Sequence, residues 1–181
     1  MSRQIVRAAA AAFCMLSLAA CVDSNGPILI DAQPLFGENV RLQFYTLRKG
    51  GADEPEQASF KWDGQRYIHG GGGMTDIAAF TMHRLEGRAF IVQSAGAKRP
   101  NIIEYAIADK LAEGVYQVTA IDEADADPVT RARNCKQVDE SHCRIATRTQ
   151  LVAFARATEA RQKGEGGLVL RLVDGSSEST R

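Results

Sequence analysis

Short runs of alternating apolar and polar residues recur along most of the chain. The run at residues 40–47 has a period of two and places Val40, Leu42, Phe44 and Thr46 on one face. This alternation is typical of a half-buried β-strand, because successive side chains of a strand point to opposite faces. The run therefore predicts a strand with one face on a core.

Further runs of this kind follow at regular intervals and are rich in β-branched and aromatic residues. They occupy 58–62, 66–69, 77–85, 88–94, 101–108, 115–121 and 168–173. Asp63-Gly64 and Glu86-Gly87 separate neighbouring runs and are typical of hairpin turns. The pattern predicts an antiparallel meander, closed as a small barrel or folded as a sandwich. We expect Trp62, with the aromatic residues near it, to belong to the core.

One segment in the C-terminal half has helical spacing instead. Thr147 and Gln150 form a capping box. Apolar residues follow at helical positions from Leu151 to Ala155, and glycines at 164–167 end the pattern. The fold class is therefore mainly β (α+β), with one helix packed on the sheet or over one barrel mouth. We expect the acidic and basic stretch at 122–136 to be a solvated loop.

Composition narrows the functional classes. Hydrophobic residues make up 45% of the 181 residues, which is too many for a disordered chain. Lys and Arg number 22, as do Asp and Glu, so the formal net charge is zero. We therefore expect no nucleic-acid partner, since nucleic-acid binding needs a basic surface.

The first twenty residues have the organisation of a signal peptide. Arg3 and Arg7 precede thirteen uncharged residues at 8–20. That run is too short to span a bilayer, which takes about 20 apolar residues, but it fits a signal-peptide hydrophobic region.

The segment Leu18-Ala19-Ala20-Cys21 resembles the lipobox of bacterial lipoproteins. The resemblance implies cleavage between Ala20 and Cys21 and attachment of a diacylglycerol, usually with a further palmitate-type acyl chain, to Cys21. Two or three acyl chains anchor a protein stably. Cys14 is a rival acceptor, but Phe13 stands before it where the motif needs a small residue. Val22, not Asp, follows Cys21, so by the family's sorting rule we expect the outer membrane, facing the periplasm, with inner-membrane anchoring as the alternative.

Processing would leave a single domain on a lipid anchor. Removal of residues 1–20 takes away two arginines, leaving 161 residues with a formal charge of −2. We expect a tether at 21–38, with a short edge strand at 28–30. One β-rich domain at 39–175 and a flexible tail at 176–181 complete the expected organisation.

The remaining cysteines of the processed chain are Cys135 and Cys143. In an oxidising compartment this pair predicts one disulfide. The alternative is a metal site that adds His142, but adjacent His142 and Cys143 do not match the usual ligand spacing. We therefore predict no metal and no cofactor.

Enzyme signatures are missing from the sequence. There is no G-x-S-x-G, H-E-x-x-H or S-x-x-K motif. His69 precedes four glycines that could bind an anion, but no P-loop lysine follows, so we predict a hairpin loop. His83 is expected to be a surface-facing strand residue.

Three functions remain open. The first is a non-catalytic binding or structural module that contacts an envelope protein or a cell-wall component. The second is inhibition of a cell-wall-degrading enzyme, since some lysozyme inhibitors are lipidated β-barrels with one disulfide. Residues 94–98 are the nearest counterpart of their Ser-Gly-x-x-Tyr loop, but they lack the tyrosine. The third is a small-ligand carrier or hydrolase with a site in the barrel or under the helix.

Overall fold

The computed structural model describes residues 22–48, 51–52, 54–72, 76–139, 142–161 and 167–173. The predicted signal peptide, its cleavage site at Ala20 and Cys21, and the predicted tail at 176–181 lie outside these residues. The described strands are β1 Val22–Ser24, β2 Asn39–Arg48, β3 Gly51–Ala52, β4 Glu56–Trp62, β5 Tyr67–Gly72, β6 Ile77–Glu86, β7 Ala89–Gly96, β8 Ile103–Ala112, β9 Val115–Ala120, β10 Lys136–Asp139, β11 His142–Arg144 and β12 Gly167–Leu172. The helices are η1 Glu123–Asp125, α1 Pro128–Asn134 and α2 Arg148–Arg161.

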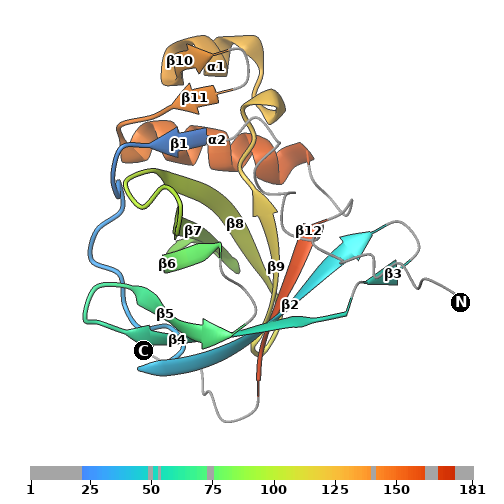
Figure 1. The fold of residues 1–181 in the computed structure, drawn as a ribbon. Coiled ribbons are helices and arrows are strands. Elements are labelled where there is room, and N and C mark those ends of the chain that lie inside the picture. Colours follow the sequence, from blue (N-terminus) through green and yellow to red (C-terminus); the bar gives the residue numbers. More distant parts are fainter. Residues whose placement is uncertain are drawn as a thin grey trace, which may run out of the picture.

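Eight strands form a closed antiparallel barrel (Figure 1). They follow the order β2, β4, β5, β6, β7, β8, β9 and β12, and β12 pairs with β2 to complete the ring. Most neighbours in the ring are consecutive in sequence and joined by short turns. The predicted mainly β fold with a barrel is confirmed, and the closed ring decides between barrel and sandwich.

The β4–β5 turn shows how the sequence sets these hairpins. Asp63 accepts hydrogen bonds at Oδ1 from the N–H groups of Gln65 and Arg66, both at 2.9 Å. These bonds lower the pKa of the Asp63 carboxyl. Gly64 follows at φ +102°, a conformation that side chains rarely adopt. The predicted Asp-Gly hairpin is confirmed.

Aromatic side chains fill much of the barrel interior. The ring of Tyr67 stacks on the ring of Phe80, with the ring centroids 4.9 Å apart. The ring of Phe60 packs edge-on against Phe80, also at 4.9 Å between centroids. Trp62 is half-buried and packs edge-on against Tyr67. The buried members of this core are Phe36, Val40, Leu42, Phe44, Ala58, Phe60, Tyr67, Phe80, Met82, Phe90, Ala108, Tyr116, Leu170 and Leu172.

A second core lies outside the barrel, between α2 and the outer face of β7 and β8. Leu151 and Phe154 of α2 are fully buried there, in one cluster with Ile91 and Ile107 of the barrel wall. The helix begins with the predicted capping box, because the N–H of Gln150 donates to the Thr147 hydroxyl while Gln150 Oε1 accepts from the Thr147 N–H. The predicted helix on the sheet is confirmed.

The N-terminal segment differs from the expected tether. Residues 22–24 form β1, whose three residues are all buried between β11 and β8. Residues 25–38, called the strap below, then run along the outside of the barrel to β2. The expected edge strand at 28–30 is not formed, because the strap is held by a side chain and not by a strand ladder.

The stretch at 122–136 is also more structured than expected. Asp127 caps α1 by accepting from the N–H groups of Val129 and Thr130, and Pro128 occupies the first turn. An N-cap aspartate followed by proline is a helix-start signal that the charge pattern masked. The strands β10 and β11 that follow extend the sheet through β1.

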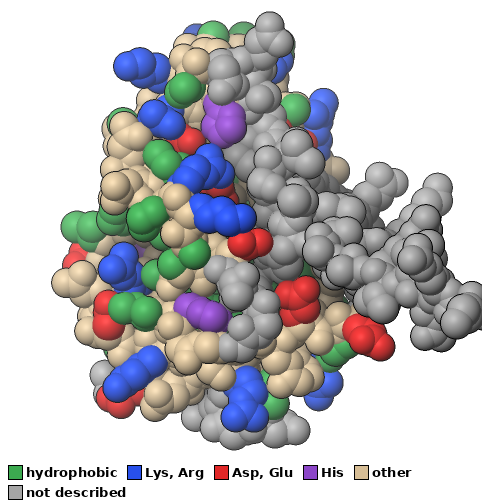
Figure 2. Space-filling model, viewed as in Figure 1, with side chains coloured by type: hydrophobic (Ala, Val, Ile, Leu, Met, Phe, Trp, Pro, Cys, Tyr) green, Lys and Arg blue, Asp and Glu red, His purple; other side chains and the backbone are tan. Residues whose placement is uncertain are grey.

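The surface carries mixed charge. On the face shown in Figure 2, positive and negative side chains alternate with hydrophobic ones, without a broad region of one sign. None of the helices in the described part of the chain has the length and apolar character of a membrane span.

Candidate functional site

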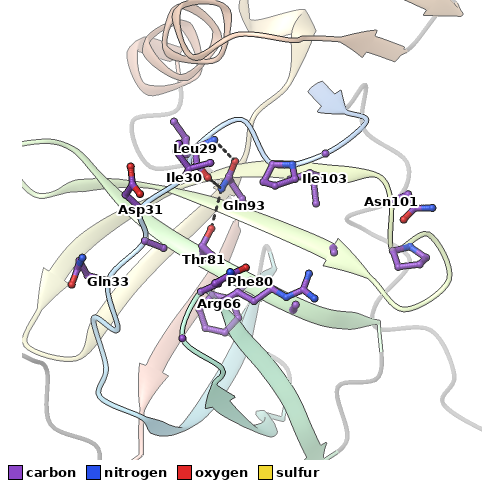
Figure 3. Close-up of a pocket in the computed structure, with 18 of the residues that line it drawn as sticks. Leu29, Ile30, Asp31, Gln33, Arg66, Phe80, Thr81, Gln93, Asn101 and Ile103 are labelled. Atoms are coloured by element: carbon purple, nitrogen blue, oxygen red, sulfur yellow. Dashed lines mark hydrogen bonds between the residues drawn. The ribbon is translucent and has the colours of Figure 1, made fainter.

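The strap and the barrel wall line two neighbouring cavities that are open to solvent, and these form the candidate site. The first has a volume of about 770 Å³ and the second about 620 Å³. Leu29, Ile30 and Asp31 line both, so the strap separates them. Figure 3 shows the first cavity.

Gln93 of β7 holds the strap in place. Its side chain is 4% exposed, and Oε1 accepts from the N–H groups of Ile28 at 3.0 Å and Leu29 at 2.8 Å. Its Nε2 donates to the carbonyl of Leu29 at 2.8 Å (Figure 3). The Gln93 side-chain amide therefore satisfies backbone N–H and C=O groups of the strap, as a paired strand would.

The same amide is tied to β6 on its other side. Gln93 Nε2 lies 3.0 Å from Thr81 Oγ1 and 3.2 Å from His83 Nε2, and Thr81 Oγ1 lies 3.0 Å from the same His83 nitrogen. Burial lowers the pKa of His83, and the positive charge of Arg148 lowers it further, against Asp31, which raises it. In the neutral tautomer that carries its proton on Nδ1, the imidazole accepts at Nε2. His83 faces outward from the barrel, as predicted, but is half-buried beside the strap.

The first cavity combines polar side chains with apolar walls. Asp31 and Gln33 of the strap lie on one side of Gln93, and Asn101 lies on the other (Figure 3). Ile30 is 73% exposed at this site although it is large and hydrophobic. The remaining lining residues are Asn25, Gly26, Pro27, Leu29, Ala32, Gly64, Gln65, Arg66, Ala79, Phe80, Thr81, Ala95, Pro100 and Ile103.

The second cavity lies beside the part of β6 that has no described strand paired on its β5 side. The pairs Tyr67↔Phe80 and Ile68↔Ala79 join β5 to β6, whereas β6 pairs with β7 along most of its length. Beyond Phe80, no described strand pairs with β6 on the β5 side. This part of β6 lines the cavity together with the strap, Phe90, Ile91, Arg148 and Val152.

The strap ends in the barrel core. The N–H of Phe36 donates to the Tyr67 hydroxyl at 2.8 Å, and that hydroxyl donates to the carbonyl of Gly37 at 2.9 Å. Tyr67 is 0% exposed, and burial raises its pKa to about 12. The strap is thus attached to the barrel at both ends of its path, by Gln93 and by Tyr67.

Strand β1 is held in place by an ion pair whose carboxylate is buried. Asp23 is 2% exposed, and its carboxylate accepts from Arg144 Nε at 2.8 Å and from its terminal nitrogen at 3.3 Å. This bonding raises the pKa of Arg144. The hydroxyls of Ser24 and Tyr105 lie 2.6 Å apart beside it. The ion pair joins β1 to β11.

The predicted cysteine pair is brought together. Cys135 and Cys143 lie at disulfide distance, with their Cα atoms 5.3 Å apart. The buried carboxylate of Glu123 lies 4.0 Å from Cys135 Sγ. The Glu123 carboxylate and the two sulfurs could hold an ion only if both cysteines were free thiolates. Disulfide formation and metal binding therefore exclude each other here. His142, the ligand considered from sequence, has its ring nitrogen 3.9 Å from Asp23.

Other candidates from the sequence are placed elsewhere. His69 belongs to β5, with its ring against Phe60, and its buried Nε2 has no hydrogen-bond partner among the described residues. The expected glycine loop is strand as far as Gly72, and residues 73–75 lie outside the described part. Ser94, compared above with a lysozyme-inhibitor loop, lies within β7 opposite Phe80. Residues 94–96 of that counterpart are therefore strand, and residues 97 and 98 begin the connection to β8.

Sequence reasoning missed two residues, Gln93, which holds the strap at the site, and Asp23, which joins β1 to β11. Gln93 stands between Ile91 and Ala95 on the face that the alternation assigns to a core, so a polar residue there was a possible signal. Asp23 gave none, because its partner Arg144 is more than a hundred residues away. Comparison of the chain with protein-family models, with curated proteins and with solved structures finds no match.

Proposed function

We propose that this protein is a lipid-anchored envelope protein of the bacterial outer membrane, facing the periplasm. In this proposal it is a non-catalytic binding module whose partner, an envelope protein or cell-wall component, occupies the cavities beside the strap. The observation that carries the proposal is the direct connection between the proposed anchor site and the cavities. The strap that borders the cavities continues directly from β1, and β1 begins one residue after Cys21.

The anchor is supported by the lipobox and by the cysteine pair. Leu18-Ala19-Ala20-Cys21 supplies the modification motif. Cys135 and Cys143 lie at disulfide distance, an arrangement that suits an oxidising compartment.

The binding role is supported by the make-up of the cavity walls. A recognition site usually combines apolar contact area with a few oriented polar groups. Here Ile30 offers exposed apolar area, while Asp31, Arg66 and Asn101 offer charge and hydrogen bonds. Gln93 is already bonded to the strap and to Thr81, so this pair positions the strap and leaves recognition to the other side chains.

Fatty-acid labelling in cells tests the anchor. An alkyne-tagged palmitate should label the wild type and a Cys14→Ser variant equally, and labelling should be lost in Cys21→Ser. Label that persists in Cys21→Ser, or that disappears in Cys14→Ser, contradicts the proposed attachment site.

Site-specific crosslinking in cells tests the binding site. A photoreactive amino acid at Ile30, which is 73% exposed, should give a defined adduct. The matched control is the same amino acid at Leu111, which is 50% exposed in the β8–β9 hairpin and away from both cavities. Equal adducts at the two positions, or none at position 30, would argue against partner binding beside the strap.

A further inference from the structure

The start of β1 limits where a bilayer can lie, an inference that rests on the lipidation of Cys21 proposed above. Val22 is 0% exposed, and its N–H donates to the carbonyl of Ile121 at 3.3 Å. One extended residue spans at most about 3.6 Å. A lipid on Cys21 is therefore joined to a buried strand with almost no slack, and the bilayer must lie close to the start of β1.

The surface next to the start of β1 belongs to β11 and β10. Val22 pairs with Cys143, and Cys143 pairs with Gln137 of β10. Neighbouring strands lie about 4.8 Å apart, so β10 is about 10 Å from β1. Figure 1 shows β10, α1 and β11 grouped at one end of the molecule, beside β1.

This end presents apolar and cationic side chains to solvent. Val129 of α1 is 56% exposed and Val138 of β10 is 49% exposed. Arg133 and Lys136 are exposed on the same elements, and Arg133 shares a helix face with Val129 four residues earlier. The nearby Asp127 carboxylate is turned toward the start of the helix, where it accepts backbone hydrogen bonds.

We propose that Val129, Arg133, Lys136 and Val138, the α1–β10 face, contact the phospholipid surface that carries the anchor. Apolar side chains can enter the headgroup boundary while cations approach the phosphates. The opposite end of the barrel then points away from the bilayer. Leu111 marks that end, since it lies seven residues along β8 from Glu104, which pairs with Asp23 near the start of β1, or about 23 Å.

Fluorescence quenching by lipid tests this orientation. The lipidated protein is purified from membranes and reconstituted into vesicles of brominated phosphatidylcholine, with unbrominated vesicles as the reference. Val138→Trp should lose emission in brominated vesicles relative to the parent protein, whose Trp62 gives the baseline. Leu111→Trp, at a position of matched exposure, should keep its added emission.

A footprint of the unaltered protein gives a second reading that does not depend on either variant folding. An amine-reactive label should modify Lys136 less in vesicles than in detergent. Lys61, an exposed residue of β4 in the barrel wall, should react equally in both.

The outcomes separate this inference from the proposal beneath it. Quenching at position 138 alone, with protection of Lys136, supports the α1–β10 face. Quenching at 111 alone, at both positions or at neither, in protein shown by mass to carry acyl chains, overturns that face and leaves the anchor standing. A membrane-extracted chain without acyl mass removes the premise, and with it the proposed anchor.

Discussion

The barrel and the layer outside it are built on different principles. In the barrel, consecutive strands pair through short turns and an aromatic interior provides the core. The outer layer combines β1 and the strap with the insertion between β9 and β12, so its contacts join segments that are far apart in sequence. Its apolar core holds α2, whereas β1 and the strap are positioned by single polar groups, namely Asp23 with Arg144 and Gln93 with the strap. Local pattern therefore suffices for the barrel and α2, whereas β1 and the strap depend on a few specific residues.

Truncation of one core aromatic residue in each region should give the largest loss of stability. Phe154→Ala in α2 and Phe60→Ala in the barrel should each lower the free energy of unfolding by about 3–5 kcal/mol, because each deletes a buried ring. Hydrogen exchange should distinguish them: Phe154→Ala should expose the outer layer first, and Phe60→Ala the whole molecule. Equal exchange profiles for the two variants would remove the distinction.

Loss of the buried ion pair comes next. Asp23→Ala leaves Arg144 without its partner, and since Arg144 is 29% exposed and can be hydrated, we expect a cost of about 2–3 kcal/mol, below that of a fully buried pair. Amides of β10 and β11 should lose protection while those of β6 and β7 keep it. Glu113→Ala is the control, because its ion pair with Lys110 is largely solvated and contributes little.

Release of the strap should cost less. Gln93→Ala removes the acceptor of the Ile28 and Leu29 N–H groups, which we expect to lower stability by about 1–2 kcal/mol, since the freed strap can be hydrated. The adduct at Ile30 should weaken in the same variant. Gln65→Ala, at an exposed lining position, should leave stability unchanged; an equal loss there would mean that the strap does not depend on Gln93.

The smallest effect is a dependence on alkaline pH. The pKa of Tyr67 is about 12 in the folded protein against about 10 unfolded, so its contribution is complete below pH 10 and is lost as pH rises toward 12. At pH 11 the loss should be about 1.4 kcal/mol. Denaturant unfolding at pH 9 and 11 measures it, with Tyr67→Phe as the variant that should lack this component. An identical pH response in both proteins would contradict the assignment.

The sequence allowed the barrel and α2 to be predicted in some detail for a physical reason. Asp63-Gly64, the alternation at 40–47 and the capping box at Thr147 each act over a few residues, so they can be recognised without knowing what lies opposite. In the outer layer only the helices carry such local signals, whereas β1 and the strap have none. Val22 to Ser24 form a strand only because β8 and β11 provide neighbours, and Gln93 has its role only because the strap crosses it. The cysteine pair was an exception, since two remaining cysteines in an expected oxidising compartment were enough to predict that Cys135 and Cys143 pair.

The most direct test of the central claim, a lipid anchor joined directly to a packed strand, is the intact mass of the protein extracted from membranes, measured before and after reduction. We expect a chain that begins at Cys21 and carries two or three acyl chains, with a gain of two protons on reduction of Cys135 and Cys143. A chain that retains residues 1–20, or one that begins at Cys21 without added acyl mass, would contradict the account.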